Sequence, residues 1–180
     1  IRFPATDVRV FKGRDSTGVR GINLAKDDIV ISLAILHHLD ATPEERATYL
    51  KDAAAARRAL TGEGEETAEA ADGEETAGEV ELGAKRLEMQ LAEQFILTVC
   101  ANGYGKLSSA YDYRRTGRGG QGITNIDNIG RNGPVVGSFP VTHGDHLMLV
   151  TDQAKLIRMG LDSLRVIGRN SAGVRLFDVA

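Results

Sequence analysis

The sequence predicts an all-β fold of propeller-like blades, each with four antiparallel strands, interrupted by an acidic helical insertion. A glycine–arginine turn recurs along the chain, and the apolar runs between its copies are short and rich in β-branched residues. Charge is also unevenly distributed. Residues 39–95 hold 15 acidic and 6 basic residues, whereas the rest of the chain holds 10 acidic and 16 basic residues. A basic body that carries an acidic insertion favours a polyanionic partner, although surface charge that serves only solubility would look the same.

The recurring turn has the pattern G-R-x-x-x-G followed by a β-branched residue, and its copies begin at Gly13, Gly117 and Gly168. The arginines of the last two copies are 51 residues apart, and those of the first two are 104 apart. The spacing between the first two arginines is therefore 53 residues longer than the spacing between the last two. The apolar runs 29–36 and 95–100 are separated by 58 residues, whereas the equivalent runs 134–141 and 146–151 are separated by 4, a difference of 54. One repeat of about fifty residues has therefore been opened at a hairpin tip and filled, and such a period is typical of propeller blades and other repeat arrays.

Five apolar runs have the length and composition of strands. They are "IVISLAIL" (29–36), "FILTVC" (95–100), "KLSSA" (106–110), "PVVGSFPV" (134–141) and "HLMLVT" (146–151). Asn102-Gly103 joins the second and third runs and is a strong hairpin signal. Asp152-Gln153 takes the matching place in the next unit, so each unit is expected to form a four-stranded blade.

The insertion begins with a clear helix start. Thr42 can cap, Pro43 suits the first helical position, and Glu45 completes a capping box. The alanine-rich stretch that follows favours helix up to Leu60, with an end near Gly62.

The remainder of the insertion divides into two parts. Residues 62–78 are acidic and glycine-rich and hold too few large apolar groups to fold by themselves. Residues 82–95 predict a second helix with Leu87, Leu91 and Phe95 on one face. We therefore divide the chain into one blade domain, residues 1–38 and 95–180, and a helical, acidic insertion, residues 39–94.

The glycine stretch 111–126 matches two further patterns. Gly117, Gly119 and Gly122 satisfy the dinucleotide fingerprint G-x-G-x-x-G, which requires an apolar strand before it and a helix after it. Here charged residues precede the glycines and helix-disfavouring residues follow, so this interpretation is rejected. An RGG element, Arg118-Gly119-Gly120, usually occurs in several copies in disordered tails, so one copy inside an ordered β repeat fits poorly.

A third interpretation fits the whole chain outside the insertion. The segments "DVRVFKGRDSTGVRGI", "NGYGKLSSAYDYRRTGRGGQGI", "RNGPVVGSFPV" and "TDQAKLIRMGLDSLRVIGRNSAGVRLF" resemble the C-terminal domain of bacterial DNA gyrase A. The resemblance implies a β-pinwheel whose repeated blades wrap DNA around a basic rim. The order of the segments agrees with the late blades of that domain.

The chain departs from the family pattern at two points. The family's signature box, Q-R-R-G-G-K-G, belongs to the first blade, and only the degenerate "GRGGQG" occurs here, with Gln121 in place of lysine. We therefore expect the box itself upstream. The resemblance starts, at Ile1, in the middle of a blade. We therefore expect this chain to hold part of one blade and about two more, and not to close a ring of blades by itself.

The resemblance implies a non-catalytic segment of a type IIA topoisomerase that wraps double-stranded DNA and supports ATP-dependent negative supercoiling. It implies as partners the remainder of gyrase A and the gyrase B protein, in an A2B2 heterotetramer. ATP and magnesium belong to the intact enzyme, and no cofactor is expected in this segment. The related protein of topoisomerase IV, and a propeller-type protein-interaction module without a nucleic-acid role, are the alternatives.

Arginine and lysine side chains around the glycine turns are the candidate phosphate contacts, because wrapping requires cations but no base-reading groups. The candidates are Lys12, Arg14, Arg114, Arg115, Arg118, Arg165 and Arg169. Secondary candidates are Lys106, Arg131, Lys155 and Arg158. The alternative for Arg14, Arg118 and Arg169 is that they point inward to an aspartate or a carbonyl of the next blade.

Other features point to no chemistry. His143, Asp145 and His146 lie on a predicted hairpin tip and, like His37-His38, are interpreted as solvated loop residues rather than metal ligands. We find no nucleophile–base pair. The absence of a signal peptide or membrane-length apolar run, and one cysteine, predict a cytoplasmic protein. The acidic stretch is interpreted as a tolerated loop, with the alternative hypothesis that it competes with DNA for the basic rim.

Overall fold

The computed structural model describes residues 1–61 and 80–179. The acidic stretch 62–78, with the hypothesis that it competes with DNA, lies outside the described residues. The elements in chain order are η1 (Ala5–Asp7), α1 (Pro43–Thr61), α2 (Ala84–Ala92), β1 (Phe95–Cys100), β2 (Tyr104–Ser109), η3 (Ala110–Asp112), β3 (Val135–Val141), β4 (His146–Val150), β5 (Leu156–Gly160), η4 (Leu161–Ser163) and β6 (Val174–Arg175), where η denotes a short 3-10 helix.

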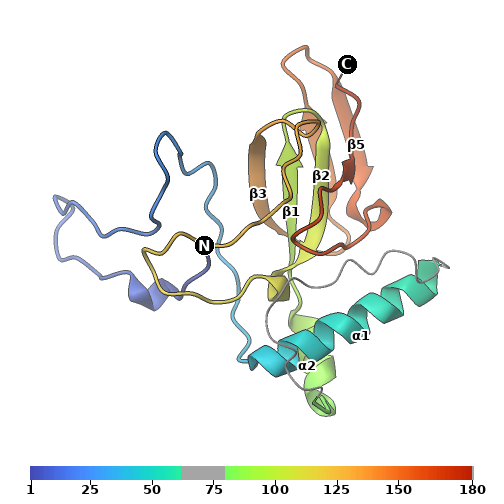
Figure 1. Cartoon of the computed structure of the whole chain (residues 1–180), viewed down its shortest axis with the longest axis horizontal. Helices are drawn as coiled ribbons and strands as arrows, with labels where there is room; N and C mark the ends of the chain where they lie inside the picture. The colour runs from blue at the N-terminus through green and yellow to red at the C-terminus, as the bar shows by residue number, and fades with distance from the viewer. Residues whose placement is uncertain (62–79, 180) are drawn as a thin grey trace.

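Four antiparallel strands form the main sheet, in the order β3-β1-β2-β6 (Figure 1). Phe95 at the start of β1 pairs with Ser109 of β2 on one side and with Val141 of β3 on the other. Strands β4 and β5 form a second, two-stranded antiparallel sheet. The predicted all-β blade fold is confirmed, including the hairpin at Asn102-Gly103, where Gly103 adopts a φ of 78°. Of the two sheets among the described residues, one has the four strands expected of a blade and the other has two.

The apolar core lies between the two sheets. Because side chains of a strand alternate between its faces, Phe95, Leu97 and Val99 of β1 point the same way. They are buried in one cluster with Leu147 of β4 and Leu161 of η4. Burial of this apolar surface holds the two sheets together.

The opposite face of the sheet is polar but also buried, and it fixes the loop that carries the second glycine turn. Thr98 of β1 is fully buried, and its Oγ1 lies 3.0 Å from Ser138 Oγ of β3. Asn125 Nδ2 donates to Thr98 Oγ1 at 2.9 Å. The Tyr113 hydroxyl in turn donates to Asn125 Oδ1 at 2.5 Å. Both ends of the loop 113–125 are thereby held on the sheet.

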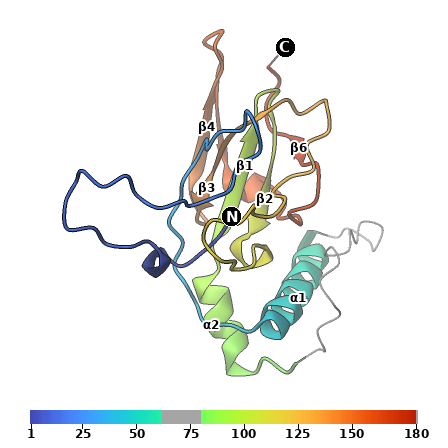
Figure 2. The same ribbon diagram turned by 60° about the vertical axis from the view of Figure 1, so that its left-hand side comes forward.

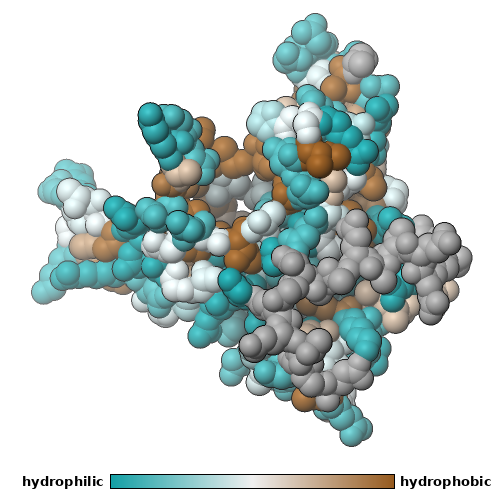
Figure 3. All heavy atoms as spheres, viewed as in Figure 1, coloured by the Kyte–Doolittle hydropathy of each residue, from teal (hydrophilic) through white to brown (hydrophobic). Residues whose placement is uncertain are grey.

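The expected strand at residues 29–36 is wrong. These residues form no strand, and Ile29, Leu33 and Ile35 are 72%, 83% and 72% exposed. In the second repeat the equivalent strand, β3, pairs with β1 of the preceding repeat. No equivalent strand precedes residues 29–36 among the described residues, so their backbone lacks a partner. Hydrophobic atoms are visible between this segment and the sheet in the space-filling view (Figure 3).

The insertion packs against the base of the sheet through two helices (Figure 2). The helix predicted from Pro43 is confirmed as α1, and the capping box is formed, with Thr42 N donating to Glu45 Oε2 at 2.8 Å and Glu45 N to Thr42 Oγ1 at 3.2 Å. The helix α1 is described up to Thr61, and the expected end near Gly62 lies outside the described residues.

The apolar face predicted for the second helix is wrong. Leu87 and Leu91 are 60% and 80% exposed, whereas Met89 is fully buried. The helix α2 ends at Ala92, and the chain is already extended at Phe95, so Phe95 cannot continue a helical stripe. The buried face of α2 is instead the one that carries Met89, which packs with Tyr49 of α1 and Tyr111 of η3. The division of the chain into blade domain and insertion stays a prediction.

Candidate nucleic-acid interface

The three glycine–arginine turns share one local geometry. The final glycine of each copy, Gly18, Gly122 and Gly173, has a left-handed φ of 78°, 85° and 79°. A short 3-10 helix precedes each turn, namely η1, η3 and η4. Residues with a Cβ rarely adopt this conformation, which explains why the pattern keeps glycine there.

The turn arginines join consecutive repeats. Arg118 of the second copy donates through Nη1 to the carbonyl of Arg20 at 2.5 Å, and through Nε to the carbonyl of Asp7 at 2.9 Å. Arg169 of the third copy donates through Nη1 to the carbonyl of Thr124 at 2.9 Å. Arg20 and Thr124 occupy the same repeat position, two residues after the final glycine. We call this contact the inter-repeat arginine bond.

Two backbone hydrogen bonds recur beside each inter-repeat arginine bond. They are Asn23 N to Gly120 O at 2.9 Å and its equivalent Asp127 N to Ser171 O at 3.2 Å, and Thr116 N to Arg2 O at 2.7 Å and its equivalent Ile167 N to Leu107 O at 2.8 Å. Of the candidate phosphate contacts, Arg118 and Arg169 are therefore half-buried and bound to carbonyls, as the alternative interpretation of these arginines described.

Replacement of Arg118 by Gln is expected to lower the free energy of unfolding by about 1 to 2 kcal/mol, because two charge-assisted, partly exposed hydrogen bonds are lost. Hydrogen exchange of the Asn23 amide should accelerate, since its acceptor Gly120 lies in the same turn. Arg14→Gln is the matched control, because it removes the same charge from an exposed side chain of the first turn. Equal exchange rates in the two variants would contradict the role of the inter-repeat arginine bond.

The remaining predicted cations are exposed. Lys12, Arg14, Arg114, Arg115 and Arg165 all have solvent-accessible side chains. They lie in the first turn, in the loop after η3 and in the segment after η4, so they are distributed over all three repeats. The same exposure holds for the secondary candidates Arg131, Lys155 and Arg158.

Lys106, also a secondary candidate, is 1% exposed and cannot contact DNA. Its Nζ donates to the carbonyls of Gly168, at 2.9 Å, and Arg169. It therefore supports the third glycine turn from inside the protein.

Arg114 and Arg115 sit on a loop whose start is fixed by Arg2. Arg2 Nη1 donates to the carbonyls of Ala110 at 2.9 Å and Tyr113 at 3.0 Å. Burial lowers the pKa of Arg2, and the positive charges of Arg46 and Arg115 lower it further. Cations from separate segments thus gather at the start of this loop, where they favour a negatively charged ligand.

A second group of cations joins the secondary candidate Arg131 to Arg175, which the sequence analysis missed. The guanidinium groups of Arg131 and Arg175 lie 5.0 and 5.5 Å from the centre of the Tyr104 ring, and Arg175 Nη2 donates to the Tyr104 hydroxyl at 3.1 Å. Arg175 pairs across the β2–β6 ladder with Tyr104 and also lies 3.9 Å from Asp178. The sequence signal was that Arg175 repeats the position of Arg20, but the stacking on Tyr104 depends on strand register.

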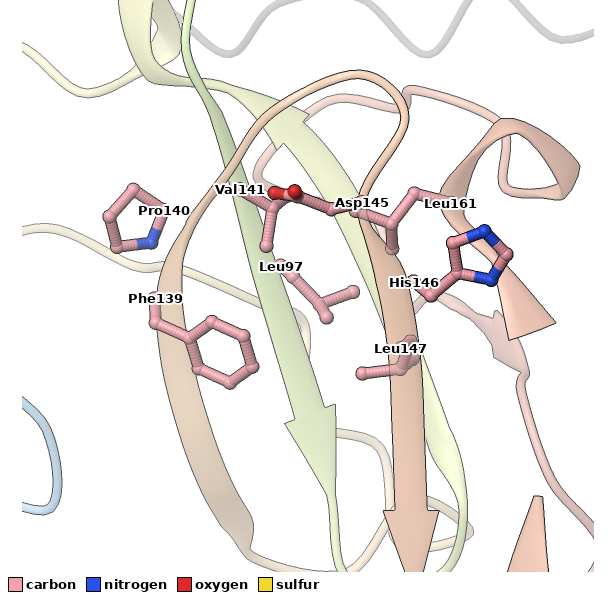
Figure 4. Close-up of a pocket in the computed structure, with 8 residues that line it drawn as sticks. All are labelled: Leu97, Phe139, Pro140, Val141, Asp145, His146, Leu147 and Leu161. Carbon is pink, nitrogen blue, oxygen red and sulfur yellow. The ribbon is translucent and has the colours of Figure 1, made fainter. Parts of the chain in front are cut away.

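An apolar recess of about 270 Å³ lies between β3 and β4 (Figure 4). Leu97 of β1 forms part of its lining, and Asp145 and His146 are its only ionisable lining residues. The Asp145 carboxylate accepts hydrogen bonds from Thr142 N and Oγ1 at 2.8 and 3.0 Å, which lower its pKa. The lining offers no hydroxyl, thiol or amine side chain.

Residues 1–61 and 80–179 contain no group of three or more His, Cys, Asp or Glu side chains arranged to hold a metal ion. Within the same ranges, no helix combines the length and apolar character that a bilayer span requires.

Comparison with known proteins gives concordant matches. The family model of the DNA gyrase C-terminal domain, a β-propeller, matches residues 1–37, 94–142 and 145–179. The DNA gyrase A protein of Granulibacter bethesdensis is 52% identical over 99% of this chain and 20% of that protein, and that of Rickettsia bellii is 49% identical over 98% and 19%. The DNA gyrase A protein of Salmonella typhimurium is 33% identical over 100% of this chain and 14% of that protein.

A solved structure of the DNA gyrase A C-terminal domain has 25% identity and a TM-score of 0.46 over 48% of this chain and 30% of that chain. The chain spans about a fifth or less of the length of the curated relatives named above. The family match covers most of the chain and leaves the helical segment unmatched, so this chain belongs to the DNA gyrase C-terminal domain family.

Proposed function

We propose that this chain binds double-stranded DNA without sequence specificity and wraps it, as a non-catalytic part of a type II topoisomerase that introduces negative supercoils. The observation that best supports this proposal is that Arg114 and Arg115 are exposed on an ordered loop. Hydrogen bonds of Arg2, Tyr113 and Asn125 fix that loop to the sheet. Cations on a preordered loop bind phosphate without first losing backbone freedom.

The surrounding enzyme enters the proposal through family membership. Because the chain spans a fifth or less of its gyrase A relatives, the rest of gyrase A, and gyrase B in an A2B2 assembly, are proposed partners. Wrapping by this segment would present DNA to the breakage-and-rejoining region, which is proposed to lie elsewhere in the enzyme together with the ATP and magnesium sites. A cytoplasmic location follows from the same proposal.

Titration of a DNA duplex with the 180-residue chain at several salt concentrations tests the binding directly. The logarithm of the binding constant should fall linearly with the logarithm of salt concentration, because bound cations displace condensed counterions. Replacement of Arg114 and Arg115 by Gln should reduce that slope by about 1.8, the contribution of two phosphate contacts.

The double variant R58Q/R86Q provides the matched control, since it removes two charges from the insertion and Arg86 is already paired with Asp52 at 3.1 Å. Its slope should equal that of the wild type. A wild-type chain that leaves the duplex unbound at low salt would instead identify a protein-interaction module.

A further inference from the structure

The hairpin tip between β1 and β2 lies at the end of the main sheet opposite η3 and the loop that carries Arg114 and Arg115 (Figure 1). Tyr104 begins β2 at this tip, whereas Ser109 ends β2 next to η3. Because a strand advances about 3.4 Å per residue, the two ends of β2 are about 17 Å apart. Cations at the tip are therefore spatially separate from the Arg114-Arg115 pair.

Two guanidinium groups lie over the ring of Tyr104 at this tip. Those of Arg131 and Arg175 are 5.0 and 5.5 Å from the ring centre, and Arg175 Nη2 also donates to the Tyr104 hydroxyl at 3.1 Å. An aromatic ring attracts a cation electrostatically, and that attraction uses none of the five N–H donors of a guanidinium. Tyr104 can thus hold both side chains in place while most of their donors remain available. We call these three residues the tyrosine–arginine cluster.

The backbone that carries the cluster is fixed as well. Asn102 Nδ2 donates to the carbonyl of Arg131 at 2.9 Å, and Asn102 N donates to the carbonyl of Asn132 at 3.0 Å. Arg175 pairs with Tyr104 in the β2–β6 ladder. Neither arginine must lose backbone freedom when it binds a ligand, and such preorganisation favours affinity.

Both arginines of the cluster are open to solvent. Arg131 is exposed, and within the described part of the chain its guanidinium has no hydrogen-bond or ion-pair partner. The Arg175 side chain is 59% exposed and lies 3.9 Å from Asp178, whose side chain is 69% exposed. An ion pair between two exposed side chains is weak and is screened by salt, so Asp178 leaves Arg175 accessible to a stronger acceptor.

The chemistry of the cluster fits a chain of phosphates. Two positive charges near one ring repel each other, and an anion that contacts both converts that repulsion into attraction. Guanidinium N–H groups match phosphate oxygens in geometry and charge. DNA carries a phosphate at every nucleotide, so a single duplex can supply an acceptor to each arginine.

We infer that Arg131 and Arg175, positioned by Tyr104, bind phosphates of DNA and form a second contact point at the end of the sheet opposite Arg114 and Arg115. The inference rests on the proposed DNA binding and deepens it. It assigns Arg175 a direct contact with DNA and makes Tyr104 a positioning residue. DNA that reaches both contact points must cross the sheet along the length of β2.

Titration of a DNA duplex with the variant R131Q/R175Q, over the salt concentrations used for the wild type, tests the contact. The variant should bind about ten- to thirtyfold more weakly at low salt, and its salt slope should be smaller by about 1.8, the contribution of two phosphate contacts. R58Q/R86Q, which removes two charges from the insertion, should match the wild type. If R131Q/R175Q behaves like R58Q/R86Q while R114Q/R115Q still lowers the slope, the inference is overturned and the proposed function stands. A wild-type chain that leaves the duplex unbound would overturn both.

The variants Y104F and Y104L separate positioning from charge. Both keep the two arginines, but only Y104F keeps the ring that holds them. Y104F should bind the duplex nearly as tightly as the wild type, and Y104L about two- to fivefold more weakly with an unchanged salt slope. Hydrogen exchange of the Leu176 amide, which donates to the carbonyl of Gly103 at 2.8 Å, reports whether the hairpin tip is intact in each variant. Equal affinity of Y104F and Y104L would refute the positioning role of Tyr104.

A further measurement uses the wild-type chain and so does not depend on how any variant folds. The Nε–H resonances of Arg131, Arg175 and Arg58 are followed by NMR while a short duplex is added. The resonances of Arg131 and Arg175 should shift in proportion to occupancy, and that of Arg58 should not. Unmoved Arg131 and Arg175 signals in a chain that binds the duplex contradict the contact. Shifts produced equally by inorganic phosphate at the same phosphate concentration would overturn the DNA assignment in favour of a free-anion site.

Discussion

Replacement of Gly173 by Ala is expected to destabilise the chain by about 3 to 5 kcal/mol, the largest effect expected among the final glycines of the three turns. Gly173 has a φ of 79°, and a Cβ there would lie 2.5 Å from the carbonyl oxygen of Gly105 and 3.0 Å from its carbon. Neither atom can move freely, because Gly105 pairs with Val174 in the β2–β6 ladder. The left-handed conformation adds about 1 to 2 kcal/mol for any residue with a Cβ.

The repeat itself provides matched controls for this prediction. Gly18 has nearly the same φ, 78°, but an added Cβ would meet nothing within 4 Å. Gly122, with a φ of 85°, is intermediate, since its Cβ would lie 3.1 Å from Ile1 N. Urea denaturation should therefore rank the losses as Gly18→Ala, then Gly122→Ala, then Gly173→Ala, with only about 1 to 2 kcal/mol for the first. Equal losses at all three positions would show that backbone conformation, and not the contact with Gly105, dominates.

The same contrast explains what the sequence could predict about the fold. A G-R-x-x-x-G pattern at fixed spacing identifies the turns, and Asn102-Gly103 identifies the hairpin, because both depend on local backbone geometry. Residues 29–36 have the composition of a strand, yet a strand also requires a partner edge, and composition says nothing about that edge. Likewise, periodicity placed Leu87 and Leu91 inside, whereas the packing of Met89 on Tyr49 and Tyr111 turned the helix the other way.

The candidate site was predictable to a similar extent. Exposure of Arg114 and Arg115 followed from a polar loop next to glycine, but the sequence could not separate arginines that face solvent from arginines that bind carbonyls of the preceding repeat. That distinction depends on the distance between repeats, which brings Arg118 within reach of the Arg20 carbonyl. The stacking of Arg131 and Arg175 on Tyr104 likewise arises from tertiary packing.

Lys106 is the buried cation whose removal should be most costly. Lys106→Met keeps the length and apolar stem of the side chain but removes the Nζ donor from the carbonyls of Gly168 and Arg169. The Gly168 carbonyl still accepts from Ser171 N and Oγ, so the Arg169 carbonyl loses more. It also removes a positive charge that acts on Asp112. Because a partly buried carboxylate then lacks one of its counter-charges, the expected loss at pH 8 is about 3 kcal/mol.

The dependence of this loss on pH tests the coupling between Lys106 and Asp112. Burial raises the pKa of Asp112 from 3.8 to about 6, although Lys106 and Arg169 lower it. A carboxyl with a raised folded-state pKa favours the native state when protonated, so its contribution to stability is lost as pH rises from about 4 to 6. In Lys106→Met that pKa should rise further, and the variant should recover about 1 kcal/mol relative to wild type when pH is lowered from 8 to 5.

The double variant K106M/D112N should be more stable than K106M at pH 8, since no charge is left without its partner. Urea midpoints measured at both pH values decide the matter, and a K106M penalty that is independent of pH and unrelieved by Asp112→Asn would show that only the lost carbonyl bonds are responsible.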